Sequence, residues 1–405
     1  MAALLLRDLA QVATPTGRPG QTARGVDLRA VDVIEDAYVL CRGETIAAVG
    51  RMRDLGPLDG EVEELDCSGL SAVPGLVDCH THPAFGGDRV GEFSLRSGGA
   101  SYEELHAAGG GILSTVTATR ALSPEALDAR VERHAAWMLA HGTTSWEGKS
   151  GYGLDHDTEL ASLRAVRSAG GSPTWLGAHS VPPEHADADA YVEFVLADVL
   201  PEAAELADAA DVFLERGAFD APQARRYLEA CAAAGLALRL HGDQFTESGA
   251  VPLAIELGAR SIDHLEATGD VGVQELGYSD VVAVLLPASA LFLDRPMPPA
   301  RALADAGAAV ALATDFNPGS SFTTSLPLIA SLACTQLHLA PEEALVAMTV
   351  NAAHVLAAAD RGALEPGLRA DVTLLDAPDW RYLAYHLAGD LVSAVVRAGS
   401  IAYRR

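Results

Sequence analysis

The stretch PGLVDCHTH, residues 74–82, decides the fold of this chain. An apolar run leads directly into His80 and His82, which stand two positions apart. Side chains at positions i and i+2 of a strand point to the same side, so both imidazoles face one way. Two imidazole nitrogens that converge from one strand form half of a divalent-metal site.

Seven more short apolar or β-branched runs follow, and helix-like stretches separate them. Eight strands alternating with helices over roughly 290 residues predict a (β/α)8 TIM-like barrel. A doubly wound open sheet is the competing α/β architecture, but it needs a Gly-rich turn where this chain has histidines. We expect helices over 124–139, with Ser123 as the N-cap, 222–234 and 341–358. The predicted strands are 72–78, 143–147, 173–177, 210–214, 236–240, 261–263, 281–286 and 308–313.

Both ends of the chain have a different pattern. The first 66 residues and the last 35 or so contain short strand-like runs between turns. Neither end has enough apolar area for its own core. We therefore expect one small β-sandwich domain built from residues 1–66 and 359–405, with the barrel occupying 67–358.

Polar residues crowd the ends of the predicted barrel strands, where the active sites of such barrels lie. Three histidines and one carboxylate, His80, His82, His241 and Asp315, make a candidate metal site with a position left for water. Asp315 is also the candidate base, because a carboxylate beside a cation stays ionised. Further polar residues at these strand ends are Glu147, Lys149, His179, Glu215 and His264.

His264 has three open roles in this interpretation. It is a candidate fifth ligand, a hydrogen-bond partner of the attacking water, or a polariser of the substrate carbonyl. A histidine of the core with no chemical role is the remaining alternative.

The composition excludes several classes of protein. With 28 Lys+Arg against 55 Asp+Glu, the formal net charge is −27, which opposes binding of nucleic acid. No apolar run approaches the roughly 20 residues of a membrane span. The five cysteines form no CxxC pair, which favours free thiols in a reducing cytoplasm. Lys149 is the only lysine, and we expect it to be an uncarboxylated structural cation.

Four motifs together point to one family: FGGDR (85–89), KSGYGL (149–154), GAHSVPPE (177–184) and TDFNPG (314–319). The chain resembles the amidohydrolase superfamily, and within it the imidazolonepropionase family, over essentially its whole length. The resemblance implies metal-dependent hydrolysis of 4-imidazolone-5-propanoate to N-formimidoyl-L-glutamate, the third step of histidine degradation. It also implies one zinc or iron ion held by the four candidate ligands, and a homodimer.

The resemblance assigns further residues to an anionic small-molecule substrate. Arg89 is the candidate clamp for the propanoate, since a guanidinium pairs with a carboxylate through two hydrogen bonds. Gln244 stands where some relatives carry Glu; a glutamine orients water but is no strong base, so proton transfer shifts to Asp315 and His264. The other expected substrate contacts are Tyr102, Tyr152, His179, Asn317, Gly319 and Ser320.

Two alternatives remain at this stage. A purine or pyrimidine deaminase would share the barrel and the ligands, but it would place a Glu as proton shuttle after the histidine of the fifth strand. A non-catalytic scaffold would have lost its ligands, whereas every expected ligand is present here.

Overall fold

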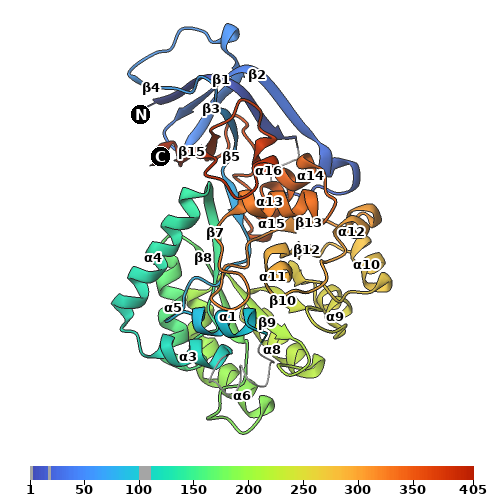
Figure 1. The fold of residues 1–405 in the computed structure, drawn as a ribbon. Coiled ribbons are helices and arrows are strands. Elements are labelled where there is room, and N and C mark those ends of the chain that lie inside the picture. The colour runs from blue at the N-terminus through green and yellow to red at the C-terminus, as the bar shows by residue number, and fades with distance from the viewer. Residues whose placement is uncertain (1–2, 17–19, 100–110) are drawn as a thin grey trace.

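The two ends of the chain meet in one β domain, and the barrel lies between them in the sequence. The computed structural model describes residues 3–16, 20–99 and 111–405. Figure 1 shows the N-terminal and C-terminal segments side by side above the barrel. Tyr102, one of the expected substrate contacts, lies outside the described residues.

The β domain is one mixed sheet of strand order β16-β15-β14-β5-β1-β2-β3, with β4 paired to β1. Leu4 and Leu6 of β1 face one hydrophobic cluster and Leu5 faces another, because successive strand residues point to opposite faces. Both faces of the sheet are therefore covered. The strands are β1 (Ala3–Pro15), β2 (Val31–Arg42), β3 (Thr45–Arg51), β4 (Val62–Asp66), β5 (Ser71–Pro74), β14 (Val372–Leu375), β15 (Val392–Arg397) and β16 (Ser400–Arg404).

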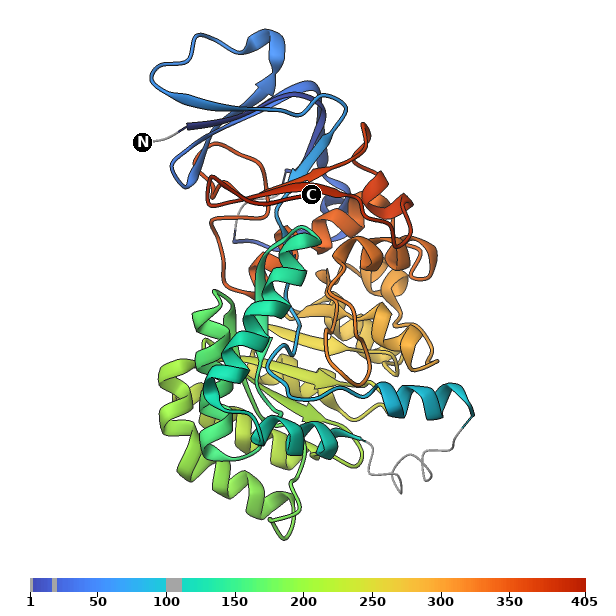
Figure 2. The same cartoon turned by 60° about the vertical axis from the view of Figure 1, so that its left-hand side comes forward.

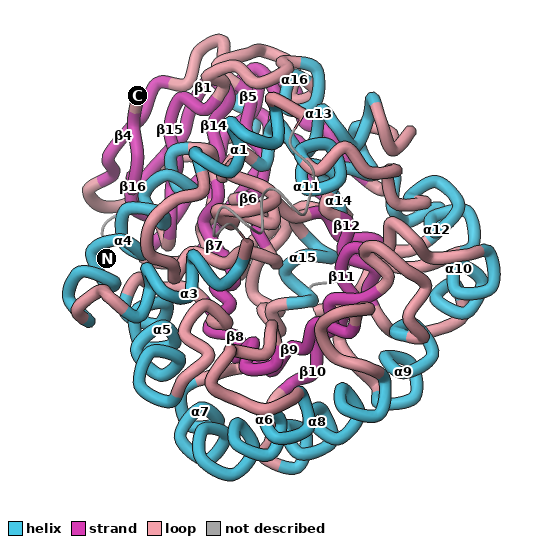
Figure 3. Tube along the Cα trace, turned by 60° about the horizontal axis from the view of Figure 1, so that its bottom comes forward, coloured by secondary structure: helices cyan, strands magenta, loops and turns pink. Residues whose placement is uncertain are grey.

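The barrel consists of eight parallel strands in sequence order, and Figure 3 shows them as a ring inside the helices. Its two ends are joined where the N–H of Asp315 donates to the carbonyl of His80 (3.0 Å) and that of His82 to Phe316 (2.9 Å). The predicted (β/α)8 barrel is confirmed. Its strands are β6 (Leu76–Asp78), β7 (Thr143–Lys149), β8 (Ser172–Ala178), β9 (Ala209–Leu214), β10 (Ala237–Gly242), β11 (Ser261–His264), β12 (Val282–Leu285) and β13 (Val310–Leu312).

Five of the described helices begin at a side chain that caps the first turn. The Ser123 hydroxyl accepts the N–H of Ala126, and Asp220 forms a capping box with Gln223. None of the described helices combines the length and apolarity that crossing a bilayer requires. The helices are α1 (Val90–Ser97), α3 (Ile112–Arg120), α4 (Pro124–Ala140), α5 (His156–Ser168), α6 (Ala188–Phe194), α7 (Leu200–Leu206), α8 (Ala221–Ala233), α9 (Ala250–Leu257), α10 (Asp270–Gly277), α11 (Pro287–Phe292), α12 (Ala300–Ala306), α13 (Leu326–Thr335), α14 (Pro341–Ala347), α15 (Val350–Val355) and α16 (Tyr382–Tyr385).

Two predicted elements are each divided in the structure. The strand expected over 72–78 is two strands: β5 belongs to the β domain and β6 to the barrel. A side chain at Gly75 would collide with Thr144 and Asp371, so the crossing between the two parts needs a glycine. Because β5 lies beyond residue 66, we place the domain boundary at Gly75. The helix expected over 341–358 is divided into α14 and α15.

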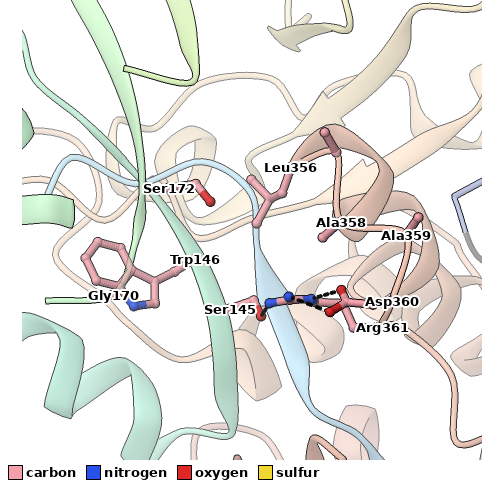
Figure 4. A pocket seen from close by; sticks show the side chains of 10 residues that line it. Ser145, Trp146, Gly170, Ser172, Leu356, Ala358, Ala359, Asp360 and Arg361 are labelled. Atoms are coloured by element: carbon pink, nitrogen blue, oxygen red, sulfur yellow. Dashed lines mark hydrogen bonds and ion pairs between the residues drawn. The ribbon is translucent and has the colours of Figure 1, made fainter. Parts of the chain in front are cut away.

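A hollow of about 550 Å³ opens at the amino-terminal ends of β7 and β8 (Figure 4). Arg361 pairs with Asp360 and donates to the hydroxyl of Ser145 at 2.7 Å on its wall. None of the predicted site residues that the structure describes lines this hollow. Figure 2 shows α1 and α3 at the other end of the barrel, away from the β domain, where the strands carry the predicted chemistry.

Candidate active site

Three imidazoles and one carboxylate converge at the carboxyl ends of the barrel strands. Nε2 of His82 lies 3.2 Å from Nε2 of His80 and 3.4 Å from Nε2 of His241. Oδ1 of Asp315 lies 3.6 Å and 3.4 Å from Nε2 of His80 and His82. Ligands about 2.05 Å from a tetrahedral metal ion are roughly 3.3 Å apart, and these four distances lie close to that value. The buried groups that could hold an ion form two overlapping sets, His80 with His82 and Asp315, and His80 with His241 and His264.

Two of the imidazoles are backed by buried carboxylates. Oδ2 of Asp263 lies 2.6 Å from Nδ1 of His80, and Oδ2 of Asp211 lies 3.0 Å from Nδ1 of His241. Oδ1 of Asp211 also accepts the backbone N–H of His241 at 3.1 Å. A carboxylate facing Nδ1 favours the proton there, which leaves the Nε2 lone pair free for a metal.

Glu147 and Lys149, which we expected at the barrel rim, lie inside the barrel. Both side chains are fully buried. The ammonium of Lys149 contacts Asp211 at 2.6 Å, Glu147 at 2.9 Å and Asp263 at 3.5 Å. Arg239 also pairs with Glu147 and donates to the carbonyl of Val355. The carboxylates behind the imidazoles are therefore part of a larger buried ionic layer.

His264 and Asp315 both have a left-handed backbone conformation, with φ of 86° and 52°. Non-glycine residues adopt such angles at an energetic cost, which is frequent at functional sites. His264, His80 and His241 offer ring nitrogens within 4.8 Å of one another, so His264 is near enough to be a further ligand. Its Nδ1 lies 3.4 Å from Oε1 of Glu266.

Burial and neighbouring charges shift the pKa values of the histidines and of Asp315 in different directions. Burial alone lowers the pKa of His264, but Glu266 and the nearby carboxylates outweigh burial and raise it. Burial lowers the pKa of His82 to about 4 and that of His179 to about 3. Burial works to raise the pKa of Asp315, but the surrounding histidines outweigh it and lower the value to about 2. Near neutral pH the site therefore has a carboxylate and neutral imidazoles available as ligands.

Arg89 lies at the edge of the site in a fixed orientation. Its Nε and Nη2 donate to the two carboxylate oxygens of Glu92 at 3.0 and 2.9 Å. Its Nη1 lies against Gly319, where an added Cβ would be only 2.1 Å away. The structure thus brings together two of the predicted substrate residues from distant segments, and the glycine is what permits the close approach.

The loop that follows β7 presents Tyr152 beside the imidazoles. The ring of Tyr152 lies 6.0 Å from that of His82 and 5.3 Å from that of His179. Burial raises the pKa of Tyr152, so its hydroxyl stays protonated. Nδ1 of His179 donates to the carbonyl of Gly151 at 2.9 Å, which leaves Nε2 without a proton.

The turn after β13 holds the last three predicted residues, Asn317, Gly319 and Ser320. Oδ1 of Asn317 accepts the N–H groups of Gly319 and Ser320, both at 2.8 Å. Nδ2 of Asn317 donates to the carbonyl of Asp315 and to the hydroxyl of Ser320. The amide of Asn317 is thus engaged within its own turn, while the hydroxyl of Ser320 lies 3.3 Å from Oδ2 of Asp315.

Glu215 follows the carboxyl end of β9, and its carboxylate is turned to the backbone of a neighbouring loop. Its carboxylate accepts the N–H groups of Phe245 and Thr246, so it holds the loop that follows β10. That loop carries the buried Gln244. Glu215 therefore shapes the site through the backbone.

Sequence reasoning missed four carboxylates that support the site: Asp211, Asp263, Glu92 and Glu159. Asp211 lies within an otherwise apolar strand run, and a charged residue in such a run is a usable signal. Asp263 lies in the short strand SIDH, directly before His264. Glu159 accepts the N–H groups of Gly151, Gly153 and Leu154 at 2.9–3.1 Å. Nothing in its helical surroundings marks that role.

The fold and site define the class of this protein. The model of the amidohydrolase family matches residues 98–403, so the chain belongs to that family. Among solved structures, a triazine hydrolase variant has a TM-score of 0.73 at 18% identity, covering 99% of this chain and 95% of that one. A zinc-bound adenosine deaminase from Xanthomonas campestris has a TM-score of 0.67 at 19% identity, covering 98% and 92%. These two show the fold alone.

Whole-chain relatives define the family more narrowly. The imidazolonepropionase of Rubrobacter xylanophilus is 61% identical, with 98% of each chain covered. Those of Deinococcus radiodurans and Chloroflexus aggregans are 45% and 43% identical, covering 99% and 98% of this chain and 100% and 98% of theirs. Within the amidohydrolases, the chain belongs to the imidazolonepropionase family and is a hydrolase.

Proposed function

We propose that this chain hydrolyses the ring amide of 4-imidazolone-5-propanoate to N-formimidoyl-L-glutamate, the third step of histidine degradation. The observation that carries the proposal is the buried cluster in which Nε2 of His82 lies 3.2–3.4 Å from Nε2 of His80, Nε2 of His241 and Oδ1 of Asp315. It is joined by the guanidinium of Arg89, which lies against Gly319 in the turn that follows Asp315. The first group fits a divalent ion, zinc or iron, and the second fits the substrate carboxylate. The relatives named imidazolonepropionase support the same reaction.

A divalent ion at this site supplies a Lewis acid and activates water for attack on a carbonyl. The chain's own side chains bind and orient the substrate. Arg89 binds the propanoate through Nη1, because its Nε and Nη2 already donate to Glu92. Tyr152, whose hydroxyl stays protonated, donates a hydrogen bond to the imidazolone ring, and Nε2 of His179 accepts one.

Proton transfer belongs to Asp315 and His264. Asp315 is ionised, accepts the proton of the attacking water and delivers it to the ring nitrogen as the C–N bond breaks. His264, whose pKa is raised, donates a hydrogen bond to the carbonyl oxygen as negative charge develops there. Gln244 orients the water from the loop after β10. Five cysteines without a disulfide support a cytoplasmic enzyme.

The test is the loss of 4-imidazolone-5-propanoate absorbance with purified protein that has been loaded with zinc or iron. We expect turnover of this substrate and no ammonia release from guanine or cytosine. Ammonia release without imidazolone turnover would instead identify the chain as a deaminase. A metal content far below one ion per chain after loading, with no turnover, would remove the proposal altogether.

A further inference from the structure

A layer of buried charge lies in the barrel interior next to the histidine cluster. Its members are two cations and three carboxylates, a net charge of −1, and each is at most 3% exposed. Removing charges from water costs several kcal/mol per ion. Such a layer is stable only where close ion pairs and hydrogen bonds between its members offset that cost. The members are Glu147, Lys149, Asp211, Arg239 and Asp263.

Lys149 is the centre of this layer. Its ammonium contacts Oδ2 of Asp211 at 2.6 Å and Oδ2 of Asp263 at 3.5 Å. The same oxygen of Asp211 lies 3.0 Å from Nδ1 of His241, and the same oxygen of Asp263 lies 2.6 Å from Nδ1 of His80. A continuous polar chain therefore runs from His241 through Lys149 to His80.

We propose that Lys149 is a positioning residue that fixes the orientation of two metal-binding imidazoles at once. The inference rests on the proposed metal site and extends it to this residue. Without the ammonium, the two buried carboxylates have no shared cation and repel each other. Either carboxylate then moves from its imidazole, and Nε2 of that ring loses its fixed direction towards the metal.

The surroundings of Lys149 also define its chemical form. Three carboxylates, those of Glu147, Asp211 and Asp263, lie within 3.5 Å of its nitrogen. A carbamate there would add a fourth negative group in a buried place, whereas an ammonium is stabilised by all three. Lys149 therefore acts as an uncarboxylated ammonium and does not bridge a second metal ion.

The experiment compares Lys149→Met with the wild type in metal-free protein. Zinc affinity is measured by competition with a chromophoric chelator, and cobalt is added separately to record the visible spectrum that reports ligand geometry. We expect zinc to bind about 10- to 100-fold more weakly, the range usual for residues behind metal ligands, and the cobalt spectrum to change. The matched control is Arg301→Met, which removes a cation from the buried carboxylate of Glu343 far from the site. The control should lower stability and leave both metal readouts unchanged.

A second comparison applies if Lys149→Met does not fold. The pair Lys149→Met/Asp263→Asn removes one positive and one negative charge, so the net charge of the layer is kept. If Lys149 acts through the carboxylates, this pair should bind zinc within about threefold of Asp263→Asn alone. If the loss of zinc affinity in the double variant equalled the product of the losses in the two single variants, the inference would be overturned.

The outcomes separate the two proposals. A wild-type protein that binds no metal would refute the metal site itself. A wild-type protein that binds one ion, with equal affinity and cobalt spectrum in Lys149→Met, would refute the positioning role alone. An intact mass higher by one carbon dioxide, lost in the Lys149 variant, would also overturn it.

Discussion

Gly319→Ala tests whether the guanidinium of Arg89 binds the substrate carboxylate. Gly319 has no left-handed backbone conformation, so an alanine fits its backbone. The new Cβ would be 2.1 Å from Nη1 of Arg89 and 2.8 Å from its Cζ. Ordinary contact needs about 3.4 Å, so the guanidinium must retreat by about 1.3 Å. The fold should tolerate this change, because the displaced atoms end a flexible side chain.

The retreat removes a hydrogen bond between charged groups. Such a bond contributes about 1.5–3 kcal/mol, and each 1.4 kcal/mol is about a factor of ten. We therefore expect KM for 4-imidazolone-5-propanoate to rise by about 10- to 100-fold with a small change in kcat. Steady-state loss of substrate absorbance measures both constants.

Two controls decide whether the effect passes through Arg89. Gly91→Ala adds the same methyl group in open space two residues from Arg89, so KM should stay unchanged. In an Arg89→Ala background, where KM is already raised, Gly319→Ala should add little. An unchanged KM in the single Gly319 variant, or fully additive losses in the pair, would refute the assignment of Arg89 as the carboxylate clamp.

Three further predictions concern the ligands, the loop after β7 and acid stability. His80→Ala and Asp315→Ala should abolish turnover and metal retention while leaving the circular dichroism spectrum unchanged; retained metal in either would contradict the ligand set. Glu159→Ala leaves the buried N–H groups of 151–154 without their acceptor, so we expect unfolding free energy to fall by about 3 kcal/mol in urea titrations and KM to rise. Burial lowers the pKa of His134 from 6.5 to about 4 in the folded protein. As the pH drops from about 6.5 to 4, the unfolded chain therefore binds a proton at this residue before the folded chain does, and the free energy of unfolding falls. Metal-free protein should lose about 3 kcal/mol through this residue, and a His134→Asn variant that loses stability as steeply as the wild type would contradict it.

The sequence brings the four candidate metal ligands together because their positions depend on local rules. An HxH pair at the end of a buried strand places both imidazoles on one side, and barrel topology brings His241 and Asp315 to the same end. The observed Nε2 distances of 3.2 and 3.4 Å agree with that expectation.

The supporting residues depend on distances that no local pattern encodes. Asp263 meets His80 across 183 positions of the chain, and only the closed barrel brings them to 2.6 Å. Glu215 ends a strand like the other predicted rim residues, yet its side chain turns to backbone N–H groups of another loop. The run 72–78 reads as one strand because both halves are apolar, although Gly75 directs them to different sheets.

The single lysine has a practical consequence for measuring how the barrel opens. A protease that cleaves only after lysine has one peptide bond to cut in this chain, after Lys149, and that side chain is fully buried. Cleavage into fragments 1–149 and 150–405 would require opening of the barrel core around β7. The appearance of these two fragments on a gel would thus report the opening of the barrel, without any probe being attached to the protein.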